Sequence, residues 1–152
     1  MPNESFLRRC YPNLSTSQWR KTSDETTDYN CIAWVMNDTE NLWDPDYFWP
    51  TNISKELPVR TETIIELCKL YNYQLCENGD LEAGSIKIAI YADQENYFQH
   101  IARQNPNGQW TSKLGDWEDI EHELVGLSGR KGSGMSPVLP YGTVVRFLKK
   151  PR

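Results

Sequence analysis

Apolar residues in the first half of the chain recur at helical spacing. One set repeats every three or four residues and predicts an amphipathic helix over residues 60–72. Its members are Ile64, Leu67, Cys68 and Tyr71. The run 31–36 is apolar all round, so we expect a buried helix over 31–37 with Asn30 or Asp28 as its N-cap.

The second half of the chain has the pattern of half-buried strands. Strands are predicted over 73–76, 86–91, 97–104, 109–114 and 141–148. The turn Asn105–Gly108 joins two of them in a hairpin, residues 1–28 look irregular, and 118–124 is expected to form a short helix. Helices followed by an antiparallel meander predict one α+β domain over residues 1–152.

Composition narrows the class of protein. With 16 basic and 21 acidic residues among 152, the net charge of -5 argues against a nucleic-acid partner. No apolar run approaches the ~20 residues of a membrane span, and the N-terminus has no signal peptide, so we expect a cytoplasmic protein unless a specialised secretion system exports it. The four cysteines show neither disulfide-scaffold nor zinc-ligand spacing, and no metal or organic cofactor is expected.

The segment 38–58 is a long loop rich in aromatic residues between Trp43 and Trp49. Loops of this length are usually functional or disordered, and the aromatic residues argue against disorder. Two interpretations stay open: the loop forms a wall of a substrate cleft, or it is a lid packed over the core.

The junction at Cys31 carries the main candidate chemistry. A helix N-terminus presents unpaired N–H groups and a partial positive charge, and both favour the thiolate that attacks carbonyl groups. Only His100 and His122 can act as its base. His100 lies on a predicted strand, which would hold the ring rigidly, so Cys31 and His100 are the expected nucleophile and general base. The simplest alternative is that Cys31 is a buried apolar residue of its helix.

A third group should orient the His100 ring. If Gln104 pairs with Gln109, His100 lies opposite Lys113, which offers no acceptor. Asp116 and Asp119 are chemically better and rank equally, although both could instead start the helix expected at 118–124.

The remaining polar residues have less specific signals. His122 is interpreted as a helix histidine paired with a carboxylate. For Arg103 and Lys113 two interpretations stay open: they hold a substrate carboxylate, or, as the simpler alternative, they face solvent. The segment Gly129–Gly134 lacks the phosphate-loop pattern and is expected to be a mobile loop. The expected substrate-contacting residues are Tyr29, Trp43, Trp49, Ser112 and Lys113.

Several short motifs span about residues 29–122, with Tyr141–Gly142 as a weaker addition. They are Tyr29-Asn30-Cys31-Ile32-Ala33-Trp34, Trp49-Pro50, Lys87-Ile88-Ala89, His100-Ile101-Ala102-Arg103-Gln104, Trp110-Thr111-Ser112-Lys113-Leu114-Gly115 and Asp119-Ile120-Glu121-His122. As a set they resemble a family of small uncharacterised bacterial proteins, a domain of unknown function with papain-like (NlpC/P60-like) character.

The resemblance implies a papain-like fold, with a helix carrying Cys31 packed on an antiparallel sheet. It makes Cys31 the nucleophile and His100 its base, with the Cys31 N–H in an oxyanion hole. The strand after His100 departs from the pattern, because Ser112-Lys113 stands where such thiol proteases often carry Asn, Asp, His or Glu.

Two functional hypotheses follow. The first is a cysteine-dependent amide hydrolase acting on a peptide or protein, as peptidase, amidase or deamidase, for instance a bacterial effector. The second is a non-catalytic protein-binding module, for instance an immunity or anti-defence protein, that uses the aromatic loop 43–49. Thiol reactivity separates them, because a catalytic Cys31 should alkylate fast near neutral pH and a structural one should not.

Overall fold

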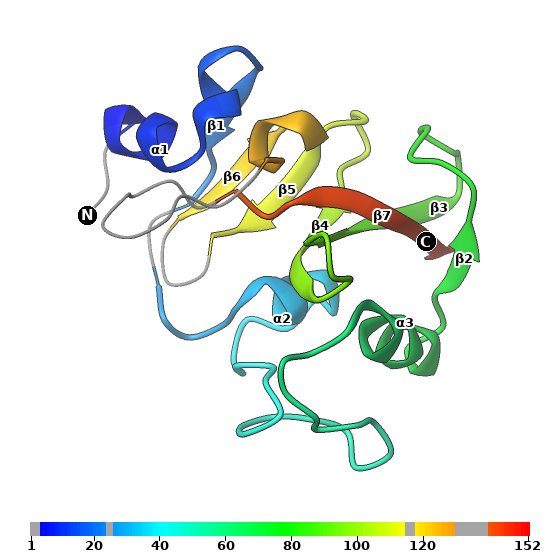
Figure 1. The fold of residues 1–152 in the computed structure, drawn as a ribbon. Coiled ribbons are helices and arrows are strands. Elements are labelled where there is room, and N and C mark those ends of the chain that lie inside the picture. The colour runs from blue at the N-terminus through cyan, green and yellow to red at the C-terminus, as the bar shows by residue number, and fades with distance from the viewer. Residues whose placement is uncertain (1–3, 24–25, 115–117, 130–139) are drawn as a thin grey trace.

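The computed structural model describes residues 4–23, 26–114, 118–129 and 140–152. Within them, seven strands form one antiparallel sheet in the order β1-β6-β5-β4-β3-β7-β2 (Figure 1). The strands are β1 (Trp19–Lys21), β2 (Gln74–Cys76), β3 (Ser85–Ala92), β4 (Phe98–Gln104), β5 (Trp110–Lys113), β6 (Asp119–His122) and β7 (Thr143–Pro151). The helices are α1 (Glu4–Cys10), α2 (Cys31–Val35) and α3 (Thr61–Leu70), with 3-10 turns η1 (Pro12–Ser15) and η2 (Leu124–Leu127). This is an α+β architecture.

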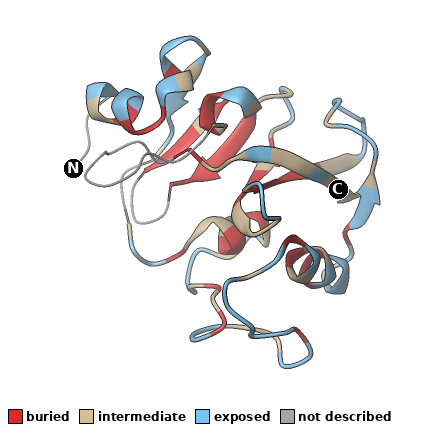
Figure 2. Ribbon diagram, viewed as in Figure 1, coloured by how far each residue is buried: buried red, intermediate tan, exposed pale blue. Residues whose placement is uncertain are grey.

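Two hydrophobic clusters cover the two faces of the sheet, and we name them after the helices that pack there. The α2 face joins α2 and α3 to sheet residues including Ile88, Ile90, Ile101 and Leu148. The α1 face joins α1, η1 and η2 to Ala89, Tyr91, Ala102, Trp110 and Ile120. Side chains of a strand alternate between faces, so neighbours in β3 and β4 belong to different clusters. Figure 2 shows the buried residues concentrated in the central strands.

The helix predictions were right where periodicity was strong. The predicted helix 60–72 is α3, and 31–37 contains α2. Ile64, Leu67 and Cys68 are buried and Tyr71 is partly buried, as expected for an amphipathic helix. None of the described helices is long and apolar enough to cross a membrane.

Two local expectations were wrong. Residues 119–122 form β6 rather than a helix, because they pair with β5 on one side and with β1, about 100 residues earlier, on the other. The N-terminal stretch is not wholly irregular either. It contains α1, which buries Leu7 and Cys10 against the α1 face.

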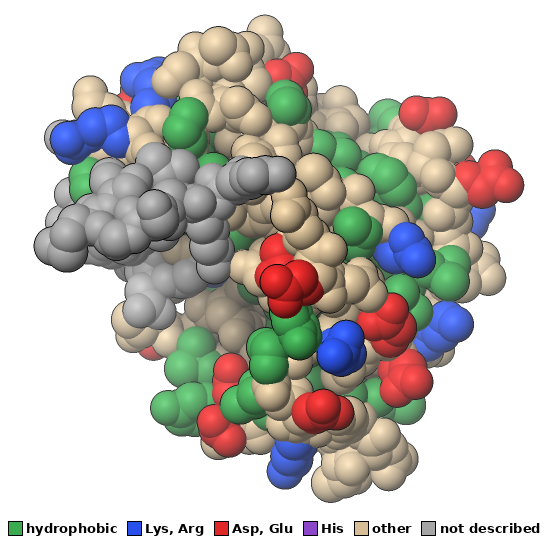
Figure 3. Space-filling view, in the orientation of Figure 1, with side chains coloured by type: hydrophobic (Ala, Val, Ile, Leu, Met, Phe, Trp, Pro, Cys, Tyr) green, Lys and Arg blue, Asp and Glu red, His purple; other side chains and the backbone are tan. Residues whose placement is uncertain are grey.

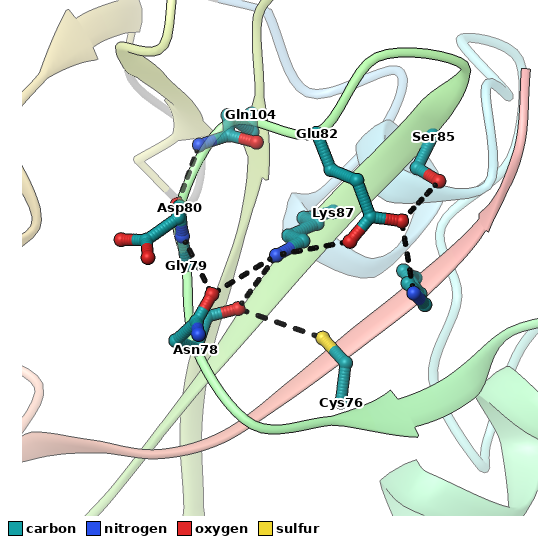
Figure 4. A network of polar contacts seen from close by, with 9 residues as sticks. Cys76, Asn78, Gly79, Asp80, Glu82, Ser85, Lys87 and Gln104 are labelled. Atoms are coloured by element: carbon teal, nitrogen blue, oxygen red, sulfur yellow. Dashed lines mark hydrogen bonds and ion pairs between the residues drawn. The ribbon is translucent and has the colours of Figure 1, made fainter.

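A buried lysine fastens the loop between β2 and β3 (Figure 4). Lys87 lies in β3 and is almost fully buried. Its Nζ donates to the carbonyl oxygen of Asn78 at 3.1 Å and to Oδ1 of the same residue at 3.2 Å. The Glu82 carboxylate lies 3.8 Å away and also pairs with Lys149 at 2.8 Å. Because these partners satisfy the Lys87 ammonium, the network is a structural clamp.

Candidate functional site

Cys31 is the first residue of α2, and Asn30 is the N-cap. The Asn30 Oδ1 accepts from the N–H of Ala33 at 3.1 Å and from that of Trp43 at 3.2 Å. Its Nδ2 donates to the Trp43 carbonyl at 2.8 Å. Asn30 rather than Asp28 therefore caps the helix, and it also ties the aromatic loop to the start of α2.

The surroundings of the sulfur do not favour a thiolate at rest. Burial raises the pKa of the Cys31 thiol to about 11, although N–H groups of Ile101 and Ile32 and the charge of Lys113 act in the opposite direction. The expectation of a depressed pKa was therefore wrong. The effect of burial on the pKa outweighs that of the helix N-terminus, because α2 is only five residues long. At neutral pH, Cys31 is a thiol.

His100 is buried in β4 with its Nε2 lacking any hydrogen-bond partner among the described residues. The ring stacks on Tyr141 with centroids 4.2 Å apart and an angle of 9°, and Tyr91 lies 5.6 Å away. Burial, assisted by the charge of His122, holds the pKa of His100 well below its usual 6.5. The imidazole is thus neutral at pH 7 and keeps a free nitrogen. Figure 3 accordingly shows no histidine on the face in view.

Cys31 and His100 both lie near β4, on different sides of that strand. Ile101 packs on the α2 face, so alternation places His100 on the α1 face. The sulfur nevertheless lies near the N–H of Ile101, the residue after His100. Tyr141, which stacks on His100, is close enough for the charge of Cys31 to raise its pKa. The two side chains share these neighbours, yet no hydrogen bond joins them in the described part of the chain.

The predicted pairing of β4 with β5 is shifted by one residue. Gln104 pairs with Trp110 instead of Gln109, and Arg103 pairs with Thr111. The pairing ends there, so Lys113 is not held opposite His100. The side chain of Lys113 instead shares the α2 face with Thr111, by alternation within β5.

Asp119 lies in β6 directly opposite Lys113. Its Oδ2 accepts a 2.6 Å hydrogen bond from the Tyr29 hydroxyl, while Oδ1 has no partner among the described residues. It therefore contacts Tyr29, two residues before Cys31, and not the ring of His100. Asp116 lies outside the described residues.

Lys113 is fully buried, so its expected exposure to solvent was wrong. Its Nζ lies 5.5 Å from the Tyr29 ring centroid, and its charge lowers the pKa of Cys31. Arg103 is partly buried: its guanidinium carbon lies 4.2 Å from the Trp34 ring, and Nη1 donates to the Trp34 carbonyl at 3.0 Å. Two cations therefore flank α2, one near its start and one at its end.

Sequence reasoning missed a buried serine–histidine pair. His122 Nδ1 lies 2.8 Å from the Glu123 carbonyl, which can only accept, so Nδ1 carries the proton. Nε2 then accepts from Ser112 Oγ at 2.6 Å. Burial lowers the pKa of His122 to about 4. The interpretation as a helix histidine beside a carboxylate was wrong, and the 2.0-residue alternation of Ile120 and His122 was the signal that could have revealed it.

Trp43 and Trp49 of the aromatic loop pack on the α2 face. Trp43 is buried against Phe48 and Tyr71, with centroids 4.9 and 5.3 Å away. Trp49 is partly buried and donates to the Ser54 carbonyl. Tyr47 at the tip is 74% exposed. Phe48 is 44% exposed, so the loop supplies core packing from Trp43 and two exposed aromatic side chains at its tip.

A family model matches residues 20–149, which include the capped Cys31 helix, β4 and the buried Asp119. The chain belongs to the DUF7689 family, a domain of unknown function. No curated protein and no solved structure matches the chain. Within the described part of this DUF7689 chain, no group of three His, Cys, Asp or Glu residues gathers as metal ligands would.

Proposed function

We propose that the chain is a cysteine-dependent amide hydrolase with a papain-like arrangement, in which Cys31 is the nucleophile and His100 the base. The observation that carries the proposal is the convergence on β4: the Cys31 sulfur lies near the N–H of Ile101, and the adjacent His100 keeps a buried Nε2 without a partner. Buried polar atoms are nearly always satisfied, so an unpaired imidazole nitrogen on the residue before Ile101, whose N–H the sulfur approaches, supports a functional role.

The chemistry starts from a neutral pair. His100 removes the thiol proton as the sulfur attacks the amide carbon, and the imidazolium returns that proton to the leaving amine. Water then hydrolyses the thioester, with His100 again as base. The N–H groups around the sulfur and the buried Lys113 ammonium supply positive charge where the thiolate and the oxyanion form. A peptide, side-chain amide or small amide would each follow this course.

The test uses p-nitrophenyl acetate, an activated ester whose leaving group needs no proton. We expect a burst of p-nitrophenolate and an acetyl group on Cys31, located by peptide mass spectrometry. His100→Gln should slow acylation by about 10²–10⁴-fold because the thiol then lacks its base. Cys76→Ser is the matched control, since Cys76 is a partly exposed thiol outside the site.

Two results would contradict the proposal. Acetylation that avoids Cys31 would make it a partly buried structural cysteine, in line with its raised pKa. Acetylation of Cys31 at the same rate in His100→Gln would remove His100 from the mechanism. Circular dichroism of the variant establishes that it is folded before either result is interpreted.

A second candidate is the protein-binding module, favoured by the exposure of Tyr47 and Phe48 at the loop tip, 74% and 44%. Aromatic side chains of this kind commonly anchor protein interfaces. If the chain is a binding module, p-nitrophenyl acetate should not acylate Cys31. Tyr47→Ala should leave the free energy of unfolding unchanged within about 0.5 kcal/mol, because the Tyr47 side chain makes few contacts within the protein.

A further inference from the structure

A cavity of about 320 Å³ lies on the α2 face, at the end of the sheet where β7 ends. Its walls include Val35, Asn37, Tyr73, Arg103, Lys150 and Arg152. The sheet register explains how two cations reach it: Arg103 of β4 lies opposite Ile88 of β3, and Lys150 of β7 lies opposite Ile86. The two basic residues therefore flank β3 on the same face.

Among the described residues, the cations that line this cavity form no ion pair. These cations are Arg103, Lys150 and Arg152, and no acidic side chain of the described residues lines the cavity. Burial lowers the pKa of Arg103, and the charge of Arg152 lowers it further against the opposing influence of Tyr73 and Asp119. A concentration of positive charge is notable in a chain with a net charge of -5.

The hydrogen-bond donors and the aromatic ring that line the cavity indicate which class of ligand it can bind. Arg103 uses one N–H on the Trp34 carbonyl, so most of its five donors remain for a ligand. Lys150 lies 4.7 Å over the Tyr73 ring, which fixes its position beside an aromatic wall. Guanidinium groups match tetrahedral oxyanions through paired hydrogen bonds, and the volume is at the lower limit for small organic ligands.

We infer that this cavity binds a small phosphate-bearing organic molecule, with Arg103, Lys150 and Arg152 around the phosphate and Tyr73 beside the organic group. The site is separate from Cys31, which begins α2, whereas the cavity lies at the end of that helix. The inference does not depend on the proposed hydrolase activity.

The experiment is calorimetric titration with phenyl phosphate as probe, at an ionic strength held constant with chloride. Phenol and benzoate serve as comparison ligands. We expect binding of phenyl phosphate that phenol does not share, and about tenfold weaker binding in Arg152→Gln and in Lys150→Gln. Arg152 is exposed, so its replacement leaves the fold intact. Lys55→Gln, an exposed lysine outside the cavity, removes the same charge and should bind like the wild type.

Several outcomes would overturn the inference. An equal loss in Lys55→Gln would reduce the effect to overall charge, and no binding of phenyl phosphate would remove the site. Benzoate binding as tightly as phenyl phosphate would replace phosphate by carboxylate as the recognised group. Cys31→Ala should bind phenyl phosphate unchanged, so failure of the hydrolase proposal and failure of this one give different results.

Discussion

The buried histidines predict a loss of stability in mild acid. His122 is fully buried between Ser112 and the Glu123 carbonyl, and its pKa falls from 6.5 to about 4. In the unfolded chain the ring regains its ordinary pKa. Between pH 7 and pH 5 the unfolded state therefore binds a proton that the folded state does not, and falling pH favours unfolding.

The magnitude follows from this pKa difference. At pH 5 the unfolded imidazole is mostly protonated and the folded one mostly neutral, so His122 alone costs about 2 kcal/mol relative to pH 7. His100, whose pKa is also depressed by burial, acts in the same direction. Carboxylates with lowered pKa, such as Glu121, lose their contribution only at lower pH, since the ordinary value is 4.5. Between pH 5 and pH 7, the change in the free energy of unfolding therefore comes mainly from the histidines.

The assay is urea unfolding at pH 5, 6 and 7, followed by tryptophan fluorescence. The wild type should lose at least about 2 kcal/mol over this range, and His122→Gln should lose about 2 kcal/mol less than the wild type. The comparison uses the pH dependence, so a lower starting stability of the variant does not matter. A wild type equally stable at pH 5 and pH 7 would refute the reasoning, because a histidine that is neutral when folded and protonated when unfolded must make stability depend on pH.

Two further substitutions test the packing. Gly142→Ala should prevent stable folding, seen as loss of the thermal transition, because a Cβ there meets the Ala92 carbonyl oxygen and φ is +83°; Gly108→Ala, with φ +90° and open space around it, should cost only about 1–2 kcal/mol. Lys87→Ala should lower the free energy of unfolding in urea by about 2–3 kcal/mol, because it removes a buried side chain together with its hydrogen bonds to Asn78. The exposed Lys55→Ala should change it by less than about 0.5 kcal/mol. Equal effects within either pair would contradict the structure.

The parts of the fold that depend on local pattern could be predicted from the sequence. The helical spacing around Leu67 predicts α3, and the turn Asn105–Gly108 between two apolar runs predicts the β4–β5 hairpin. In both cases the residues that decide the structure lie within one short window. The exact register could not be derived, since Gln104 pairs with Trp110 through a shift of a single position.

The errors arise where partners are far apart in the chain. The segment 119–122 becomes a strand because β1 pairs along its outer edge, and nothing in its four residues indicates that partner. The same strand assignment moves His122 onto the α1 face and Asp119 onto the α2 face. The sequence identified both as polar candidates, but their contacts with Ser112 and Tyr29 required the tertiary structure.

The protonation state of the candidate pair illustrates the same limit in chemical terms. A helix N-terminus is a local feature and favours a thiolate at Cys31, whereas burial is a property of the whole fold and disfavours every charge. The same burial raises the pKa of the thiol and lowers that of His100, so both effects keep the pair neutral. Burial therefore favours a neutral thiol and imidazole over a resting thiolate–imidazolium pair. If Cys31 reacts, proton transfer to His100 has to accompany the attack on the substrate, and the reactivity of the sulfur depends on the base more than on its own pKa.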